Sequence, residues 1–485
     1  MNNIMSKQIC CFILIAALFL PMASAESAVV TFQPRLSIQE EYTSNFFLEN
    51  DNEEHDFSTS VSPGFLTEVR GRASSISFFY EPAYHYYANH NDYSSWSHSV
   101  GLTGTHHASR QTTLNVSNSF LYTSEPIDSW STFSQEGISS STTSGGTDSG
   151  SASSFDSSSG SSFDSSANAS AFDSAVNRES PVGSYNYSSR GSRETYYTNT
   201  ASVGLEQQFG VDDSFSLNYT YAILENDDPS LDDNQSHSPS FNLVYWIAPN
   251  LWRLETTGTY TRGLYDGDSD DFHEWGADIE IFRQINRHFE GVLRYSHSAI
   301  YFDGDTEDYQ IYSPSIGMRY TSTENTMVYV SVGYYIQDRK NGGNDSGFLA
   351  NCDIQKAWLF RQATIRVNAT SGYDLSYLDT DNLGFRVYYG GGINAQYRFT
   401  RHLTGYLFST YQWEKYPTDA SATAEDRIDN NLEYGLGSDY RITPWLTSGI
   451  QGVTRLLKSS EHENDFLEHR ILLNLTISPS QPYRF

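Results

Sequence analysis

The stretch FRVYYGGGINAQYRF, residues 385–399, decides the fold of this 485-residue chain. Its odd positions carry mainly apolar and aromatic side chains: Phe385, Val387, Tyr389, Gly391, Ile393, Ala395, Tyr397 and Phe399. Its even positions carry mainly polar or cationic side chains: Arg386, Tyr388, Gly390, Gly392, Asn394, Gln396 and Arg398. A period of two over this length predicts a β-strand with one apolar and one polar face. In a soluble sandwich the apolar face would meet protein, and in a membrane barrel it would meet lipid. The three glycines at 390–392 predict either a bend in the strand or open space beside it.

The amino-terminal residues have the features of a secretory signal. Lys7 precedes an apolar run at residues 10–22, and Ala23-Ser24-Ala25 forms a small-residue cleavage site. We expect residues 1–25 to be removed, which leaves Cys352 as the one cysteine of the mature domain 26–485 and excludes an internal disulfide there. No later apolar run approaches the ~20 residues that a transmembrane helix needs.

Turn residues divide the chain into about twenty strand patterns, and their connections alternate between short and long. Short connections lie at residues 70–72, 210–213, 248–250, 285–287, 400–402 and 443–445. Longer acidic or serine-rich connections lie near 47–56, 88–93, 125–193, 225–235, 266–271, 303–308, 339–346, 417–427 and 459–466, with a briefer one at 378–381. This alternation is typical of outer-membrane barrels, whose turns are short on the periplasmic side and long outside.

We therefore expect an all-β fold, a transmembrane antiparallel up-and-down β-barrel of about 20 strands in the cell outer membrane of a Gram-negative bacterium, with both termini periplasmic. A count of about 18 would follow if the hairpin near 56–87 were misread. The 35 Tyr, 28 Phe and 8 Trp, with only 38% hydrophobic residues, favour a barrel, which needs aromatic girdles but no large apolar core. The Ser-rich residues 125–193 predict a long disordered extracellular loop within the barrel domain.

Charged side chains on the polar strand faces must avoid lipid, where each would cost about 2 to 4 kcal/mol at mid-membrane. We expect the following side chains to face the lumen or its mouths: Arg253, Arg294, Arg319, Arg366, Asp374, Arg386, Tyr388, Arg398, Tyr406, Glu414, Asp439, Arg441 and Arg470. Arginine forks bind carboxylates and phosphates, and aromatic rings offer faces to sugars, so this set suits a conduit for polar or anionic polymers. The alternative is that the charges pair with one another and stabilise the wall.

Signals for catalysis, cofactors and metals are weak. The chain has neither a G-x-S-x-G elbow nor an H-E-x-x-H zinc helix, so we expect no enzyme activity and no cofactor. The acidic stretches at 266–271 and 303–308 lack the spacing of a calcium loop, so we expect no metal site, although divalent ions could bridge them weakly to lipopolysaccharide. The formal net charge of -30 argues against nucleic acid as a partner.

The start of the mature chain carries a further pattern in PRLSIQEEYTSNFFLEN (34–50) and DFSTSVSPGF (56–65). A strand with the core E-x-Y-(T/S)-x-N, here Glu40 to Asn45, precedes an acidic loop and then D-F-x-T-x-V-S-P-G. This resembles a family of outer-membrane β-barrel porins whose genes often lie beside those for exopolysaccharide synthesis and exosortase. The resemblance covers roughly residues 34–126, loosely in its second half, and the serine-rich insert departs from it.

The resemblance implies an outer-membrane channel that takes part in exopolysaccharide export, and so in biofilm formation, together with a periplasmic polysaccharide-export protein. Two alternatives stay open: a general diffusion porin for small solutes, and a surface-display or adhesion protein whose barrel anchors the 125–193 loop. The other expected partners are outer-membrane lipid, lipopolysaccharide and the barrel-assembly machinery, which often engages a terminal aromatic residue such as Phe485.

Overall fold

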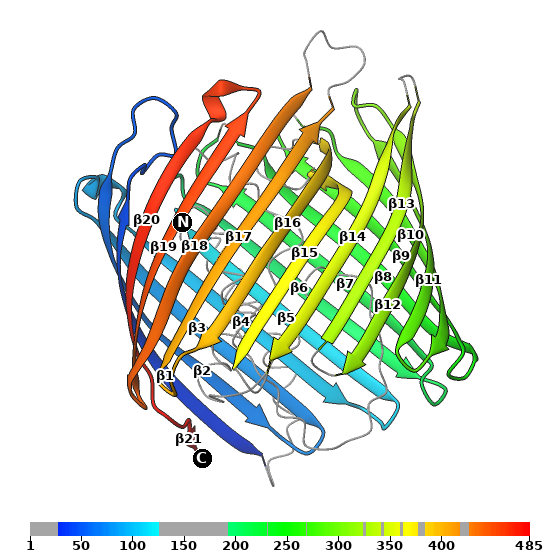
Figure 1. Ribbon diagram of the computed structural model, residues 1–485, viewed down its shortest axis with the longest axis horizontal. Coiled ribbons are helices and arrows are strands. Elements are labelled where there is room, and N and C mark those ends of the chain that lie inside the picture. Colours follow the sequence, from blue (N-terminus) through cyan, green and yellow to red (C-terminus); the bar gives the residue numbers. More distant parts are fainter. Residues whose placement is uncertain are drawn as a thin grey trace.

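Each strand pairs antiparallel with the next, and the twentieth strand pairs with the first, so the sheet closes into a barrel (Figure 1). The closing ladder joins residues 36–43 to residues 470–477. This confirms the expected all-β barrel of about twenty strands. The structure, a computed structural model, describes residues 28–125, 193–229, 231–267, 269–323, 326–340, 344–358, 362–376, 384–417 and 426–485, without the side chains of 323, 355–358, 374–376 and 384.

The strands of the barrel, within the described residues, have the following bounds. They are β1 (Val29–Thr43), β2 (Asp56–Arg70), β3 (Ser74–Tyr87), β4 (Ser95–His107), β5 (Thr112–Thr123), β6 (Tyr196–Gln208), β7 (Ser214–Asn226), β8 (Asp233–Ala248), β9 (Trp252–Asp266), β10 (Phe272–Asn286), β11 (Phe289–Phe302), β12 (Tyr309–Thr323), β13 (Thr326–Arg339), β14 (Asp345–Trp358), β15 (Ala363–Ser376), β16 (Gly384–Arg398), β17 (Leu403–Tyr416), β18 (Arg427–Thr443), β19 (Leu446–Ser459) and β20 (Phe466–Ile477). A short strand β21 (Tyr483–Arg484) and two 3-10 turns, η2 (Asn91–Tyr93) and η5 (His462–Asn464), complete the described elements.

No helix in the described part of the chain is long and apolar enough to cross a membrane. The expected signal at 1–25 and nearly all of the expected loop at 125–193 lie outside the described residues, as does the connection at 378–381.

The carboxyl end of the chain extends the closing seam. Phe485 exchanges backbone hydrogen bonds with Val30, donating to it at 2.9 Å and accepting from it at 3.3 Å. Leu36 pairs with Ile477 but Thr31 pairs with Arg484, so β21 is offset by two residues from the register of β20. The offset falls at the segment containing two prolines, which cannot donate to a ladder. The terminal aromatic residues thus lie against β1 despite the interruption.

The two ends of the barrel differ in the lengths of their connections. Connections after even-numbered strands are short, as between Thr443 of β18 and Leu446 of β19. Connections after odd-numbered strands are mostly longer, as between Ser459 of β19 and Phe466 of β20. The start of β1 and the carboxyl terminus lie at the end with the short connections (Figure 1). The predicted alternation of connection lengths is therefore present in the structure.

Aspartates close several of the longer connections. Each accepts a hydrogen bond from a backbone N–H near the end of the preceding strand, a charge-assisted contact stronger than one between neutral groups. The pairs are Asp233 with Asn226 (2.7 Å), Asp271 with Tyr265 (2.9 Å), Asp308 with Phe302 (3.0 Å) and Asp465 with Ser459 (2.6 Å). Part of the acidic clustering seen in the sequence therefore serves to hold hairpin ends together.

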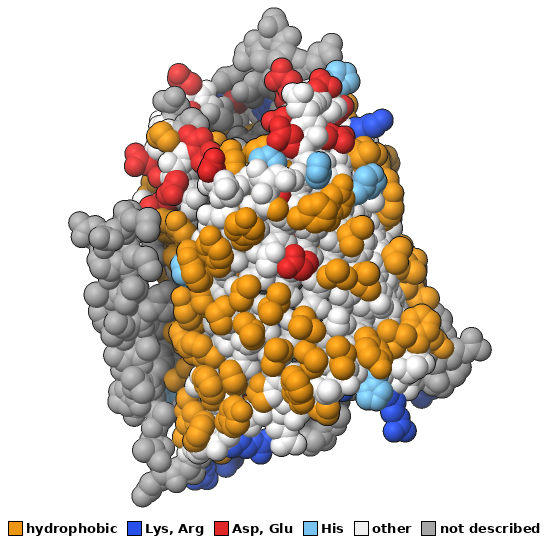
Figure 2. Space-filling model, turned by 90° about the vertical axis from the view of Figure 1, so that its left-hand side faces the viewer, with side chains coloured by type: hydrophobic (Ala, Val, Ile, Leu, Met, Phe, Trp, Pro, Cys, Tyr) orange, Lys and Arg blue, Asp and Glu red, His pale blue; other side chains and the backbone are white. Residues whose placement is uncertain are grey.

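The outer face of the wall is apolar. On β16 the side chains of Tyr389, Ile393 and Tyr397 are 40%, 40% and 44% exposed. Figure 2 shows hydrophobic side chains spread over the face of the barrel in view, with most acidic side chains gathered at one end, one acidic side chain midway along the wall, and Lys and Arg at both ends. Because side chains alternate between the two faces of a strand, the polar residues of the same strands face the lumen.

The upper part of the β15–β16 hairpin departs from the expected orientation. β14 and β15 pair only from Asn351 with Thr370 to Trp358 with Ala363, and among the described residues no ladder joins the rest of the two strands. We call residues 371–376 and 384–389, which lie beyond this point, the flap.

The flap bends into the barrel. Phe385 and Val387 share a strand face with Tyr389, which lies outside, yet they are only 5% and 4% exposed and pack with Tyr309 and Tyr335. These two tyrosines lie on the inner face of β12 and β13, because the alternate positions of those strands are exposed. The expectation that Phe385 and Val387 meet lipid is wrong in this structure, because the flap lays its outer face against the inner wall.

Candidate functional site in the barrel lumen

The inner face of β9, β11 and β12 carries a chain of ion pairs. Arg253 on β9 lies 2.7 Å from Glu255 and 3.5 Å from Glu290 on β11. Arg319 on β12 reaches the second oxygen of Glu290 at 3.3 Å. One carboxylate is therefore shared by two arginines from different strands, which links three strands through their lumen side chains.

Two further groups of ion pairs line the lumen. Arg294 on β11 lies 2.7 Å from Asp278 and 3.4 Å from Glu280, both on β10. The other group lies on β14 to β17. Arg366 of β15 pairs with Asp353 of β14 at 3.1 Å, and Arg386 of β16 pairs with Glu414 of β17 at 2.7 Å. Each pair joins neighbouring strands, because residues directly or diagonally opposite in a ladder are close enough to touch.

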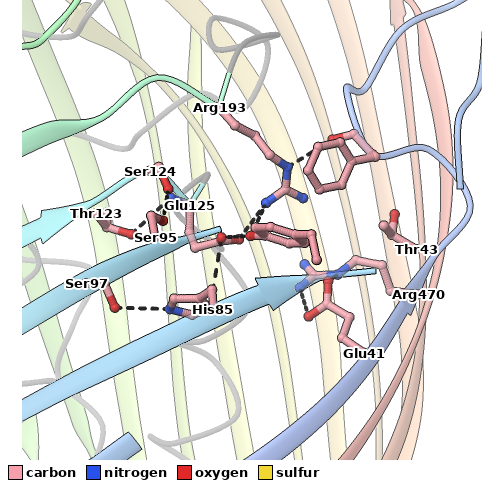
Figure 3. Close-up of polar contacts among 12 residues, drawn as sticks. Glu41, Thr43, His85, Ser95, Ser97, Thr123, Ser124, Glu125, Arg193 and Arg470 are labelled. Atoms are coloured by element: carbon pink, nitrogen blue, oxygen red, sulfur yellow. Dashed lines mark hydrogen bonds and ion pairs between the residues drawn. The ribbon is translucent and has the colours of Figure 1, made fainter. Parts of the chain in front are cut away.

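A fourth group crosses the closing seam of the barrel (Figure 3). The two oxygens of Glu41 on β1 accept from two nitrogens of Arg470 on β20, at 2.9 and 2.8 Å, in a forked arrangement. The Thr43 hydroxyl donates to Glu468 at 2.8 Å, and the other oxygen of Glu468 lies 3.3 Å from Arg455 on β19. The first and last strands of the barrel are therefore joined by charges as well as by backbone hydrogen bonds.

Aromatic rings share the lumen with the arginines. The guanidinium carbon of Arg253 lies 4.2 Å from the ring centre of Phe282 and 5.4 Å from that of Trp246. Arg319 approaches the same Phe282 ring at 5.8 Å. A cation over an aromatic face is stabilised by the ring quadrupole, more so when water is excluded. The arginines therefore have two kinds of partner, carboxylates and rings.

The structure places most of the candidate residues in these groups. The candidates that take part in ion pairs are Arg253, Arg294, Arg319, Arg366, Arg386, Glu414 and Arg470. The ring of Tyr388 lies 5.9 Å from the guanidinium carbon of Arg386, and Tyr406 donates to Gln451 at 3.4 Å. This pairing corresponds to the alternative in which lumen charges neutralise one another and stabilise the wall.

The remaining candidates lie elsewhere. Arg398, Asp439 and Arg441 occupy strand ends near the short connections of β16 and β18. The side chain of Asp374 lies outside the described side chains. The candidate residues thus form several separate groups along the wall rather than one site.

The mouth at the end with the long connections holds a cluster that the sequence reasoning missed (Figure 3). Arg193, just before β6, donates to the Phe46 carbonyl at 3.1 Å, to the Tyr87 hydroxyl at 3.0 Å and to Glu125 at 2.6 Å. Its guanidinium carbon lies 4.1 Å from the centre of the Phe46 ring, and the Tyr87 hydroxyl donates to Glu125. One arginine therefore joins two connections of the barrel, β1–β2 and β5–β6, to the end of β3.

The connection between β1 and β2 folds inward at this mouth. The Asn45 amide donates to the Glu49 carbonyl at 2.7 Å, and its oxygen accepts from the Glu49 N–H at 3.1 Å. Leu48 packs against Leu457 and Phe466, which lie on the inner face of β19 and β20. The mouth is therefore narrowed from two sides, by this connection and by the flap.

His90 is held between two carboxylates beside the same connection. Its ring nitrogens lie 2.7 Å from Asp56 and 2.7 Å from Glu54, and its ring stacks on Phe46 with centroids 4.4 Å apart. Burial opposes a charge on this ring, but the hydrogen bonds to Glu54 and Asp56 outweigh burial and raise the pKa of His90. The pattern at residues 34–65 was the sequence signal that could have located this mouth, because its Asn45 and Asp56 both make hydrogen bonds there.

The side chains around Arg193 at this mouth, which we call the mouth cluster, are tightly packed. Leu48, Glu125, Arg193, Arg455, Glu468 and Arg470 line a cavity of about 20 Å³. That volume holds one water molecule rather than a ligand. Across the part of the chain that the structure describes, no three His, Cys, Asp or Glu side chains converge in a way that could hold a metal ion.

No family model matches the chain, and no curated protein sequence matches it. Among solved structures it is similar to the siderophore receptor PirA from Pseudomonas aeruginosa, with 8% identity over 92% of this chain and 80% of that chain and a TM-score of 0.47. It is also similar to OccAB4 from Acinetobacter baumannii, with 11% identity over 92% of this chain and 98% of that chain and a TM-score of 0.41. OccK2 (OpdF) from Pseudomonas aeruginosa, in complex with glucuronate, gives 8% identity over 92% and 98% of the two chains and a TM-score of 0.41. At these values the similarities carry no argument about the function of this chain, and its barrel is established by its own strand pairing.

Proposed function

We propose that this chain is a channel of the outer membrane that lets small polar solutes cross through its lumen. One observation carries the proposal: a closed barrel wall whose outer face is apolar and whose inner face carries ion pairs. A closed barrel pairs its backbone groups within the wall, which is the condition for β-structure to cross lipid. A barrel with this many strands encloses an aqueous channel unless something fills it.

The inner side chains favour small solutes over a dedicated polymer path. Arg253, Arg294 and Arg386 already have carboxylate partners, so they have less charge to offer a passing anionic chain. The inward connection at Leu48 and the flap both reduce the width of the mouth. A hydrated, mostly neutralised passage of limited width suits diffusion of small hydrophilic molecules.

Liposome swelling tests this proposal. Proteoliposomes containing the folded chain should swell in isosmotic solutions of small sugars, at rates that fall as the sugar becomes larger. The matched control contains the same amount of chain that was not allowed to fold. Swelling no faster than this control, in vesicles that demonstrably contain the folded barrel, would overturn the proposal.

Exopolysaccharide is the second candidate for what passes through the channel. The observation that favours it is the pattern at 34–65, whose Asn45 and Asp56 shape the mouth. Deleting the gene should then reduce polysaccharide in the surface matrix while small-sugar uptake changes little. An unchanged matrix would exclude this substrate, and reduced uptake of small solutes would support the first proposal instead.

The remaining assignments depend on the same proposal. In the membrane, the long connections would lie outside the cell, and both termini would lie in the periplasm. Outer-membrane lipid and lipopolysaccharide would surround the wall, the barrel-assembly machinery would engage the end of the chain at Phe485, and a periplasmic polysaccharide-export protein would join only for the second candidate. Deleting residues 137–176 would abolish function only if the barrel were an anchor for surface display or adhesion.

A further inference from the structure

The wall contains a seam that is only half paired. β14 begins at Asp345 and β15 ends at Ser376, but their ladder stops at Asn351 and Thr370 (Figure 1). If the same register continued, Ala350 would pair with Ser371, and each later residue in turn, until Asp345 paired with Ser376. The unpaired parts therefore match in length and end on the same rung, as two halves of one continuous ladder would.

The flap is held away from β14 by contacts on the inner wall. The Ser313 hydroxyl of β12 donates to the Tyr373 hydroxyl at 3.1 Å. The ring of Phe385 lies 6.0 Å from that of Tyr309 and 6.2 Å from that of Tyr335, centre to centre. The flap thus crosses the inner faces of β13 and β12 and occupies part of the lumen.

Where the ladder between β14 and β15 stops, hydrogen bonds from side chains replace some of the missing backbone hydrogen bonds. The Ser371 hydroxyl accepts from the Ala350 N–H at 2.6 Å and donates to the Ala350 carbonyl at 3.2 Å. The Tyr389 hydroxyl donates to the Phe348 carbonyl at 3.4 Å. Backbone groups of a wall in lipid are costly to leave without partners, which favours a position where the whole ladder forms.

The bend coincides with the glycines of the FRVYYGGGINAQYRF stretch. Gly390 lies opposite Thr370, where the β14 ladder stops, and Gly391 and Gly392 lie opposite the two preceding residues of β15. Glycine lowers the cost of a sharp change in strand direction because it has no Cβ. On its other edge β16 stays paired with β17 from Val387 to Arg398, through these glycines. The flap therefore does not swing as a free hairpin, and the upper end of β17 moves with it.

The side chains of the flap suit two positions. In a fully paired wall, Tyr373, Phe385 and Val387 would join Tyr389 on the apolar outer face, because they share its strand face. In the docked position the same three residues pack with Tyr309 and other apolar residues of the inner wall. Arg386 would face the lumen in both positions, since it lies on the other face.

We propose that the flap is a gate that moves between the docked position and a position in which β14 and β15 pair along their whole length. This rests on the proposed channel function, because it concerns the width of the same lumen. In the docked position the flap narrows the mouth while its β16 edge stays paired with β17. In the paired position its β15 edge also joins β14, so the wall is continuous there and the mouth is wider. The contacts of Tyr373 and Phe385 with the inner wall set the equilibrium between the docked and the paired positions.

A disulfide across the unpaired seam tests the gate. In a Cys352→Ala background, Ser346→Cys with Leu375→Cys places two thiols opposite each other only in the paired position. Directly opposite residues in antiparallel strands have Cβ atoms close enough for a disulfide. We expect the disulfide to form under oxidation in intact outer membranes and to raise single-channel conductance, and we expect reduction to restore the original value.

The matched control lies on the same seam. Ile354→Cys with Val367→Cys, in the same background, joins residues that are already paired and separated from the test pair by an even number of rungs. This disulfide should form without changing conductance. Tyr373→Phe, which loses the hydrogen bond to Ser313, should raise the fraction of time spent at the higher conductance without any disulfide.

The outcomes separate the gate from the channel itself. Formation of the control disulfide but not of the 346–375 disulfide would overturn the gate, as would a 346–375 disulfide that leaves conductance unchanged. If the control variant carries no current, the channel function fails, whereas the yield of the 346–375 disulfide still decides whether the flap reaches the wall.

Discussion

Single ion pairs show why the lumen carries less unpaired charge than the number of its charged side chains suggests. Arg366 lies 3.1 Å from Asp353, and both side chains are partly accessible from the lumen. An ion pair at this distance neutralises both charges for a passing ion, and removing one partner exposes the other. Selectivity should therefore respond to the difference between the two charges rather than to the arginine alone.

Replacing Arg366 by Gln should shift the reversal potential of the channel towards cation selectivity, because Asp353 then lacks its cation. In the double variant Arg366→Gln with Asp353→Asn, both charges are gone, and the reversal potential should return close to the original value. Planar-bilayer recordings under a potassium chloride gradient measure both. Equal shifts in the single and the double variants would mean that Asp353 does not pair with Arg366 in the membrane.

His90 predicts a pH dependence of the mouth. Its hydrogen bonds to Glu54 and Asp56 raise its pKa above the ordinary value of 6.5, against the opposing effect of burial. The folded mouth therefore favours the protonated ring of His90. The stabilisation that this ring gives to the mouth is complete below the ordinary pKa of 6.5 and is lost as the pH rises through the raised pKa. Hydrogen exchange of residues 44–55, corrected for intrinsic rates, should speed up across this range.

The control for this prediction is His90→Gln, which keeps a polar side chain but does not titrate. In that variant the corrected exchange of residues 44–55 should be faster at low pH than in the original chain and should not depend on pH. If the variant kept the original pH dependence, another group would be responsible.

The sequence could predict which residues face the lumen but not which of them touch. Period-two alternation assigns a strand face locally, as it does for Arg386. Its partner Glu414 is determined by the register between β16 and β17, which a single strand pattern does not contain. The mouth cluster was harder still, because Arg193 and Phe46 lie in connections without any periodic signal.

Elements of the wall were predictable where the signal is local. Alternation and turn residues located the strands, and connection lengths gave the even strand count. The flap was not predictable, because Tyr373, Phe385 and Val387 are apolar and suit either lipid or the inner wall. The glycines at 390–392 indicated a bend, but the direction of the bend depends on packing against β12 and β13.

The closing seam between β1 and β20 should be sensitive to the loss of one charge. Arg470→Met leaves Glu41 buried without its forked partner, which costs on the order of 3–5 kcal/mol for a buried pair. The urea concentration at the midpoint of unfolding, followed by heat-modifiable gel mobility, should fall.

The control for the seam is Arg70→Ala, which breaks an ion pair with Glu68 in which the arginine side chain is 67% exposed. Exposed pairs contribute roughly 0–1 kcal/mol, so this midpoint should hardly move. A similar small change in both variants would show that Glu41 and Arg470 do not stabilise the closure.

At the scale of the whole molecule, charged side chains are distributed unevenly along the barrel axis as well as between the inner and outer faces. Most of the acidic side chains in view gather at one end, the end with the long connections, while Lys and Arg lie at both ends (Figure 2). Much of the net charge of -30 lies in those connections, where carboxylates such as Asp308 also hold hairpin ends. Such an end would attract cations and repel anions approaching the mouth at low ionic strength.

Single-channel recording of the purified, folded chain in planar lipid bilayers tests the central claim most directly. A closed barrel with an apolar outer face and a hydrated, ion-paired lumen should insert and give discrete, reproducible current steps in potassium chloride. Insertion can be verified independently by heat-modifiable gel mobility of the reconstituted chain. A folded, inserted chain that carries no current would contradict the account.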